Sequence, residues 1–143
     1  MTKNEVLKLY GINAAGINCK TASFNQVLSQ LNPHIWMVEE TKLKPHQKIK
    51  SDSLNDFQVY YLSRQESHGG GIALGVSKMF ESTFINGGND DTEVMSVLVL
   101  VGDIPIRIVV GYGVQENASN AKKEKFWDFI EKEVIQLNKK NKD

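Results

Sequence analysis

Three short stretches of the 143-residue chain hold side chains suited to phosphate or metal chemistry. Asn13 begins Asn-Ala-Ala-Gly, Glu40 lies in Val-Glu-Glu-Thr-Lys, and Tyr112 lies in Val-Gly-Tyr-Gly-Val-Gln. A carboxylate is a natural ligand for Mg²⁺, a hard cation that prefers oxygen. An asparagine can orient a phosphate or a water, and a tyrosine hydroxyl can donate a hydrogen bond to a phosphate oxygen. These residue types are the equipment for metal-assisted cleavage of phosphodiesters.

Each of these stretches lies at the end of an apolar segment that predicts a β-strand. The segments cover residues 6–12, 34–38 and 104–112. Sheets in α/β domains tend to place ligand sites at the carboxyl ends of their strands. The positions of the three stretches therefore suit a ligand site.

The rest of the pattern predicts two helices and more strands. A helix over 23–31 begins with a Ser23/Gln26 capping box, and a second, amphipathic helix covers 117–137. The apolar face of the second helix consists of Phe126, Phe129, Ile130, Val134 and Leu137. The further strands cover residues 57–62, 72–76, 80–85 and 93–101. This order is typical of an α/β domain with a mixed, mostly antiparallel sheet.

The strand over 93–101 is apolar at nearly every position, so both of its faces should be buried. If both helices cover one face of a single sheet, the other face stays exposed. Such a face would exceed the few hundred Å² of apolar surface that soluble monomers tolerate. We therefore expect a partner there, either a complementary half-domain or a second copy in a homodimer.

Four motifs, in this order and spacing, resemble the endonuclease/exonuclease/phosphatase superfamily. They are Asn13 in Asn-x-x-Gly, Glu40 in Glu-Thr-Lys 27 positions later, the glycine-led segment 69–76, and the strand 108–112 that ends in Tyr112. The likeness is to the N-terminal half of exonuclease III-type AP endonucleases and retrotransposon endonucleases, and it covers roughly residues 5–137.

The resemblance implies a fold and a set of roles. The fold is a single domain over 1–143, half of a DNase I-like four-layer α/β sandwich with helices on one face of the sheet. The activity is that of a nuclease dependent on Mg²⁺ or Mn²⁺, with Glu40 as metal ligand and Asn13 and Tyr112 in the catalytic site. Lys42 and Gln115 are the candidates for substrate binding. The family usually has Pro and Asn shortly after the tyrosine, where this chain has Val114 and Gln115.

The family's second half is the part that this sequence does not show. That half brings a Gly-Asp-x-Asn strand end and a late Asp-His pair that activates the water, and neither follows Leu137. We therefore expect the isolated chain to be inactive and to need a complementing C-terminal half. Two alternatives remain open: a catalytically inactive remnant that serves as a binding or assembly module, and a phosphatase of the same superfamily.

The charge balance restricts how the chain could bind nucleic acid. It has 17 Lys plus Arg and 17 Asp plus Glu, a net charge of zero, so its whole surface cannot act as a polyanion-binding surface. A nucleic-acid role must rest on a metal ion or on a local patch. The lysines at 42, 44, 48 and 50 are either a solvated loop or such a patch.

The cysteine content and the hydropathy of the chain indicate its cellular compartment. Cys19 is the single cysteine, so no internal disulfide can form, which favours a reducing compartment. The longest apolar stretch, 94–101, is too short to span a bilayer. The N-terminus shows no apolar signal core. We expect an intracellular protein, cytoplasmic or nuclear, without a membrane partner.

Overall fold

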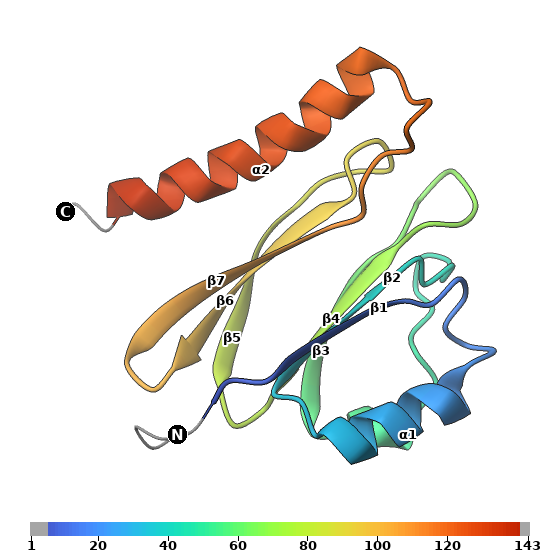
Figure 1. Cartoon of the computed structure of the whole chain (residues 1–143), viewed down its shortest axis with the longest axis vertical. Coiled ribbons are helices and arrows are strands. Elements are labelled where there is room, and N and C mark those ends of the chain that lie inside the picture. Colours follow the sequence, from blue (N-terminus) through green and yellow to red (C-terminus); the bar gives the residue numbers. More distant parts are fainter. Residues whose placement is uncertain (1–5, 141–143) are drawn as a thin grey trace.

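A computed structural model describes residues 6–140, with the side chains of 135–140 left outside the description. The chain forms two β-sheets and two long helices in four layers, in the order helix, sheet, sheet, helix (Figure 1). The α/β class and the mixed, mostly antiparallel pairing agree with the sequence prediction. Residues 1–5, on which the predicted absence of a signal peptide depends, lie outside the described residues.

The first sheet has four strands in the order β1-β2-β4-β3. Their bounds are β1 Leu9–Asn13, β2 Ile35–Glu39, β3 Phe57–Leu62 and β4 Ile72–Ser77. β1 and β2 run parallel, and helix α1 (Thr21–Leu31) connects them, whereas the other pairs are antiparallel. A short 3-10 turn, η1 (Asp52–Leu54), precedes β3.

The second sheet is a three-stranded antiparallel meander. Its strands are β5 (Glu81–Gly87), β6 (Val94–Val101) and β7 (Ile104–Gly111), and helix α2 (Asn120–Lys140) follows them. The apolar runs of β6 and β7 account for this pairing, because β-branched residues fit the pleated surface of a buried sheet.

The two sheets pack face to face and bury one apolar core between them. β4 contributes Leu74 and Val76 to this core, and β6 contributes Met95, Val97 and Val99, all of them inaccessible to solvent. A second core lies on the outer face of the first sheet, where Phe24 of α1 packs edge-on against Trp36 of β2 with ring centroids 5.1 Å apart.

Helix α2 covers the outer face of the second sheet through one aromatic contact and one polar cluster. Phe126 is buried and packs beside Gly111. The carboxylate of Glu133, only 3% exposed, accepts hydrogen bonds from Ser96 (2.9 Å), Asn86 (2.9 Å) and Arg107 (3.0 Å). A buried carboxylate with this many donors is satisfied, so the cluster fixes the register of α2 on the sheet.

Three sequence predictions need correction. The chain does not leave one sheet face bare: each sheet carries a helix on one face and packs its other face against the other sheet. The Ser23/Gln26 capping box does not form, because α1 begins at Thr21 and its N-cap residue, Lys20, makes no side-chain cap. Helix α2 begins at Asn120 rather than at 117, Val134 is 47% exposed, and the Leu137 side chain lies outside the described residues.

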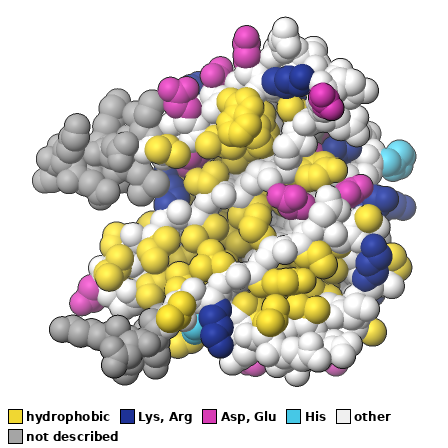
Figure 2. Space-filling view, viewed as in Figure 1, with side chains coloured by type: hydrophobic (Ala, Val, Ile, Leu, Met, Phe, Trp, Pro, Cys, Tyr) yellow, Lys and Arg dark blue, Asp and Glu magenta, His cyan; other side chains and the backbone are white. Residues whose placement is uncertain are grey.

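The two sheets contact each other along one side of the sandwich, and on the opposite side each sheet ends in a free edge strand. Near β3 and β5, the Tyr60 hydroxyl lies 2.7 Å from that of Ser82, and Tyr60 stacks on Phe84. The free edges on the opposite side are β1 and β7, where Leu9 is 59% and Ile104 65% exposed. Figure 2 shows hydrophobic side chains gathered on the face over these two edges. Exposed apolar side chains therefore lie along the free edges of the two sheets.

Candidate functional site

A polar cavity of about 450 Å³ lies at the end of the sandwich where β2 and β7 finish. Segments from both sheets line it: the loop after β2, the β3–β4 hairpin, the β5–β6 loop and the segment that leads into α2. Its charged and phenolic side chains are Glu40, Arg64, Asp90, Asp91, Glu93, Tyr112 and Lys122. The strand-end residues Glu40 and Tyr112 thus line one cavity, although β2 and β7 belong to different sheets.

Glu40 is held at this cavity in a backbone conformation that is unusual for its residue type. Its φ is +55°, in the left-handed region that residues other than glycine seldom adopt. The carbonyl of Glu40 accepts a hydrogen bond from the Gly16 N–H (2.9 Å), and the next residue, Thr41, donates to the Gly71 carbonyl (3.1 Å). Neighbouring loops thus hold the strained residue in place, and backbone strain of this kind concentrates at functional sites.

Tyr112 lines the same cavity as Glu40. Its backbone N–H donates to the Glu93 carbonyl (2.9 Å), which fixes the chain just after β7. Burial raises the pKa of the Tyr112 hydroxyl, and the carboxylates of Glu40 and Glu93 raise it further. The hydroxyl therefore stays protonated at neutral pH and remains a hydrogen-bond donor for an anionic oxygen.

Asn13 lies beside this cavity, not in it. It pairs with Glu39 in the β1–β2 ladder, and its Oδ1 accepts a hydrogen bond from the Ala15 N–H (3.2 Å). Asn13 and Glu39 line a separate shallow cavity of about 220 Å³. Burial raises the pKa of the Glu39 carboxyl. Glu39 was not among the predicted site residues, although its position next to Glu40 in the sequence was a visible signal.

The two predicted substrate-binding residues border different cavities. Gln115 is exposed and lines the cavity of Glu40 and Tyr112. Lys42, also at φ +55°, lines a neighbouring cavity of about 460 Å³, and its Nζ lies 4.0 Å from a Glu40 carboxylate oxygen. The structure thus brings Glu40, Tyr112 and Gln115 together and places Asn13 and Lys42 at the margins.

An ion pair missed by the sequence analysis forms one wall of the cavity. Arg64 donates to the two carboxylate oxygens of Glu93, Nε to Oε1 at 3.0 Å and Nη2 to Oε2 at 2.9 Å. Glu93 is 7% exposed and also accepts from the Gly71 N–H (2.8 Å). Gly70 is required at this point, because a Cβ there would collide with both Arg64 and Glu93. The partners are 29 residues apart, so no local motif reveals the pair.

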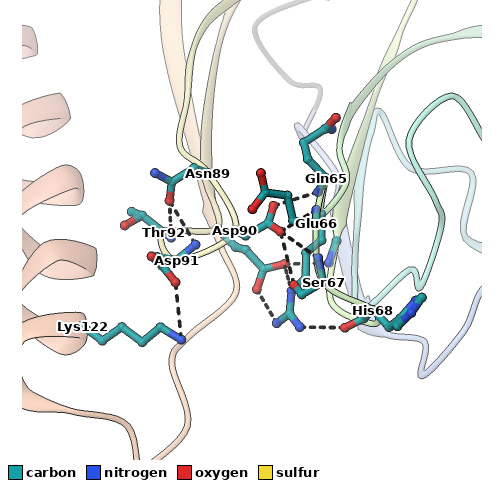
Figure 3. Close-up of polar contacts among 12 residues, drawn as sticks. Gln65, Glu66, Ser67, His68, Asn89, Asp90, Asp91, Thr92 and Lys122 are labelled. Atoms are coloured by element: carbon teal, nitrogen blue, oxygen red, sulfur yellow. Dashed lines mark hydrogen bonds and ion pairs between the residues drawn. The ribbon is translucent and has the colours of Figure 1, made fainter.

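Asp90 makes a second link between the two sheets (Figure 3). Its carboxylate accepts hydrogen bonds from three successive backbone N–H groups, those of Gln65 (2.8 Å), Glu66 (3.0 Å) and Ser67 (3.1 Å). Burial acts to raise the pKa of Asp90, but these bonds outweigh it and hold the pKa below its usual value. The adjacent Asp91 makes a longer ion pair with Lys122 of α2, at 3.5 Å.

The site offers part of what a hard cation needs. Among residues 6–140 there is no group of three or more His, Cys, Asp or Glu side chains placed to hold a metal ion. Glu40 presents one carboxylate, 26% exposed, to the cavity. Mg²⁺ is often bound by one or two carboxylates together with waters and substrate phosphate oxygens. The residues present therefore fit the first contacts of such a site.

Comparison with known proteins relates the fold to DNA-processing enzymes. No family model and no curated protein sequence matches the chain. Among solved structures, it matches the endonuclease domain of the telomere-specific non-LTR retrotransposon TRAS1 (TM-score 0.64, 12% identity, 88% of this chain and 54% of that one). It matches an AP endonuclease from Archaeoglobus fulgidus (0.62, 17%, 94% and 52%). It also matches the 3′ phosphatase NExo from Neisseria, bound to product DNA hairpin (0.64, 16%, 91% and 53%).

These matches confirm the predicted fold. The chain has the fold of half of a DNase I-like α/β sandwich, and it spans about half the length of the solved structures that it matches. Within the described part of the chain, no helix is both long and apolar enough to cross a membrane.

Proposed function

We propose that this chain is one half of a divalent-metal-dependent phosphodiesterase that acts on nucleic acid. The observation that carries the proposal is the convergence of Glu40 and Tyr112 on one polar cavity, with Glu40 held at φ +55°. The fold supports the choice of reaction, because the structures that share it include two endonucleases and a 3′ phosphatase bound to DNA.

Each residue of the site has a role in this proposal. Glu40 would hold Mg²⁺ or Mn²⁺, which when bound would neutralise charge on the phosphoryl oxygens. Tyr112 donates a hydrogen bond to a phosphate oxygen, since a tyrosine hydroxyl keeps its proton at neutral pH and the surroundings of Tyr112 raise its pKa further. Gln115 contacts the substrate from the mouth of the same cavity. Asn13 orients the phosphate or the water from the margin, and Lys42 contacts the adjacent phosphate.

The proposed partner is a complementing C-terminal half that adds strands to the free edges of β1 and β7. Each edge presents unpaired backbone N–H and C=O groups, which can form a ladder with another strand. Exposed side chains such as Leu9, Ile12 and Ile104 lie along these edges. The half-length matches support this arrangement, since those solved chains continue beyond the part that is shared. In this proposal the complementing half supplies the general base, the role that the resemblance gives to a late Asp-His pair.

A complementation experiment tests the proposal. Purified chain alone, with Mg²⁺ or Mn²⁺, should not nick plasmid or abasic-site DNA. Addition of the complementing half, either fused to this chain or expressed as a separate polypeptide, should produce metal-dependent nicking. Glu40→Gln should abolish that nicking, whereas Glu81→Gln, an exposed carboxylate on β5, should not.

Two outcomes would count against the proposal. Nicking by the chain alone, lost in Glu40→Gln, would show that no complementing half is needed. A complex of both halves that binds DNA but never cuts it would identify the chain as an inactive binding or assembly module.

A phosphatase activity of the same site is the second candidate. It is favoured by the match to NExo, a 3′ phosphatase. Release of inorganic phosphate from a 3′-phosphorylated oligonucleotide, without internal cleavage, separates it from the nuclease.

A further inference from the structure

A loop between β2 and β3 concentrates positive charge on a chain whose net charge is zero. Residues 42–50, which we call the lysine loop, contain four lysines and one histidine and no Asp or Glu. All four lysines are exposed. Such a local excess of cations is the electrostatic signature of a polyanion-binding surface.

The lysine loop is held in a fixed shape by its apolar residues. Leu43 and Ile49 are 4% and 6% exposed and belong to the core beneath α1. The Ile49 N–H donates to the Tyr61 hydroxyl (3.1 Å), and the Lys50 N–H donates to Asn18 Oδ1 (3.2 Å). The buried residues therefore anchor the loop and direct the lysines to solvent. A pre-ordered loop loses less entropy when it binds than a mobile one does.

The lysine loop adjoins the candidate active site. Lys42 and Lys44 line the cavity of about 460 Å³ whose other wall is the β3–β4 hairpin, including His68. Arg64 and Gly69 line this cavity and also the cavity of Glu40 and Tyr112. The two cavities are therefore adjacent, and Lys42 and Lys44 border the one next to Glu40 and Tyr112.

We propose that the lysine loop binds the sugar–phosphate backbone of a nucleic acid beside the cavity that holds Glu40. The choice of nucleic acid over other polyanions rests on the proposed function. The loop contains no Phe, Tyr or Trp to stack on a base, so its main contacts are with phosphates and binding is largely independent of sequence. Lys44, Lys48 and Lys50 act in binding and take no part in chemistry.

Fluorescence anisotropy of the 143-residue chain with labelled DNA and RNA oligonucleotides, in EDTA, tests this inference. The variant Lys44→Gln/Lys48→Gln/Lys50→Gln should bind at least about tenfold more weakly at low salt, and its salt slope for duplex DNA should fall by about 2 to 3. The control Lys8→Gln/Lys125→Gln/Lys132→Gln removes the same charge from exposed lysines elsewhere and should bind like wild type. Thermal unfolding followed by circular dichroism checks that both variants fold.

The results separate this inference from the proposed function. Binding that needs the lysine loop and is unchanged in Glu40→Gln supports the inference, whether or not cleavage is ever obtained. Equal loss in the two lysine variants would overturn it, because bulk charge would then explain binding. Equal or tighter binding of heparin would overturn the choice of nucleic acid, and undetectable binding at low salt would overturn the inference altogether.

Discussion

Arg64 and Glu93 join the two sheets through a pair of parallel hydrogen bonds of 3.0 and 2.9 Å. Arg64 belongs to the hairpin after β3, and Glu93 immediately precedes β6. The main-chain carbonyl of Glu93 also receives the N–H of Tyr112. This one ion pair therefore connects the first sheet, the second sheet and the candidate catalytic tyrosine.

Loss of Arg64 should destabilise the fold strongly. Arg64→Met leaves Glu93, 7% exposed, with an unpaired charge, and breaking a buried pair in this way costs about 3 kcal/mol. Chemical denaturation measures the free energy of unfolding. The double variant Arg64→Met/Glu93→Met should recover part of the loss, because no unpaired charge remains. A change below about 0.5 kcal/mol in Arg64→Met, within the range of ordinary surface substitutions, would show that the pair is not a structural link.

Asp90 should stabilise the protein in a pH-dependent way. Its pKa is lower in the folded state than in the unfolded state, so its contribution is fully present above the unfolded pKa of about 3.9. The contribution is lost as the pH falls through the lower folded pKa. Asp90→Asn should therefore cost about 1 to 2 kcal/mol at pH 7, and the difference from wild type should shrink below about pH 4.

Asp91 is the matched control for Asp90. It is the adjacent carboxylate, but its ion pair with Lys122 is 3.5 Å long and about half exposed on both sides. Exposed pairs contribute about 0 to 1 kcal/mol, so Asp91→Asn should change the pH profile little. Equal effects of the two substitutions would contradict the role assigned to the three N–H groups around Asp90.

The free edges of β1 and β7 should make the isolated chain associate. Leu9→Lys/Ile104→Lys places a charge on each edge, and charged edges resist strand pairing. Light scattering across a concentration series should show self-association of the wild type that is at least about tenfold weaker in this variant, a loss of about 1.4 kcal/mol. Leu31→Lys, at a residue of α1 that is 49% exposed, should behave like wild type. A wild type that stays monomeric at every concentration would mean that the edges are not association sites.

The sequence predicted the strands well because their apolar runs are long and end in glycine, proline or polar turns. The predicted segment 57–62 coincides with β3, and 93–101 differs from β6 by one residue. Glu40 just follows the predicted segment 34–38, and Tyr112 ends the predicted segment 104–112. Both side chains do line one cavity.

The sequence could not show what covers each face of a strand. β6 is apolar on both sides: Met95, Val97 and Val99 face the other sheet, whereas Val94 and Ser96 lie toward α2. A single covered sheet and two packed sheets produce the same apolar run. The polar links at Asp90 and Glu93 were also invisible, because each joins residues more than 20 positions apart. Arg64 was missed for this reason, although it lines the cavity of Glu40 and Tyr112.

Titration of the ¹⁵N-labelled chain with Mn²⁺ tests whether a divalent cation binds at Glu40. The paramagnetic ion broadens the amide signals nearest to its site. With a dinucleotide phosphodiester present, we expect early broadening of the amide signals of Glu40, Thr41, Tyr112 and Gly113. The affinity for Mn²⁺ should be roughly millimolar, because one carboxylate makes a weak site. The broadening should be lost in Glu40→Gln and kept in Glu81→Gln. Broadening centred elsewhere, or unchanged in Glu40→Gln, would show that the cation does not bind at Glu40.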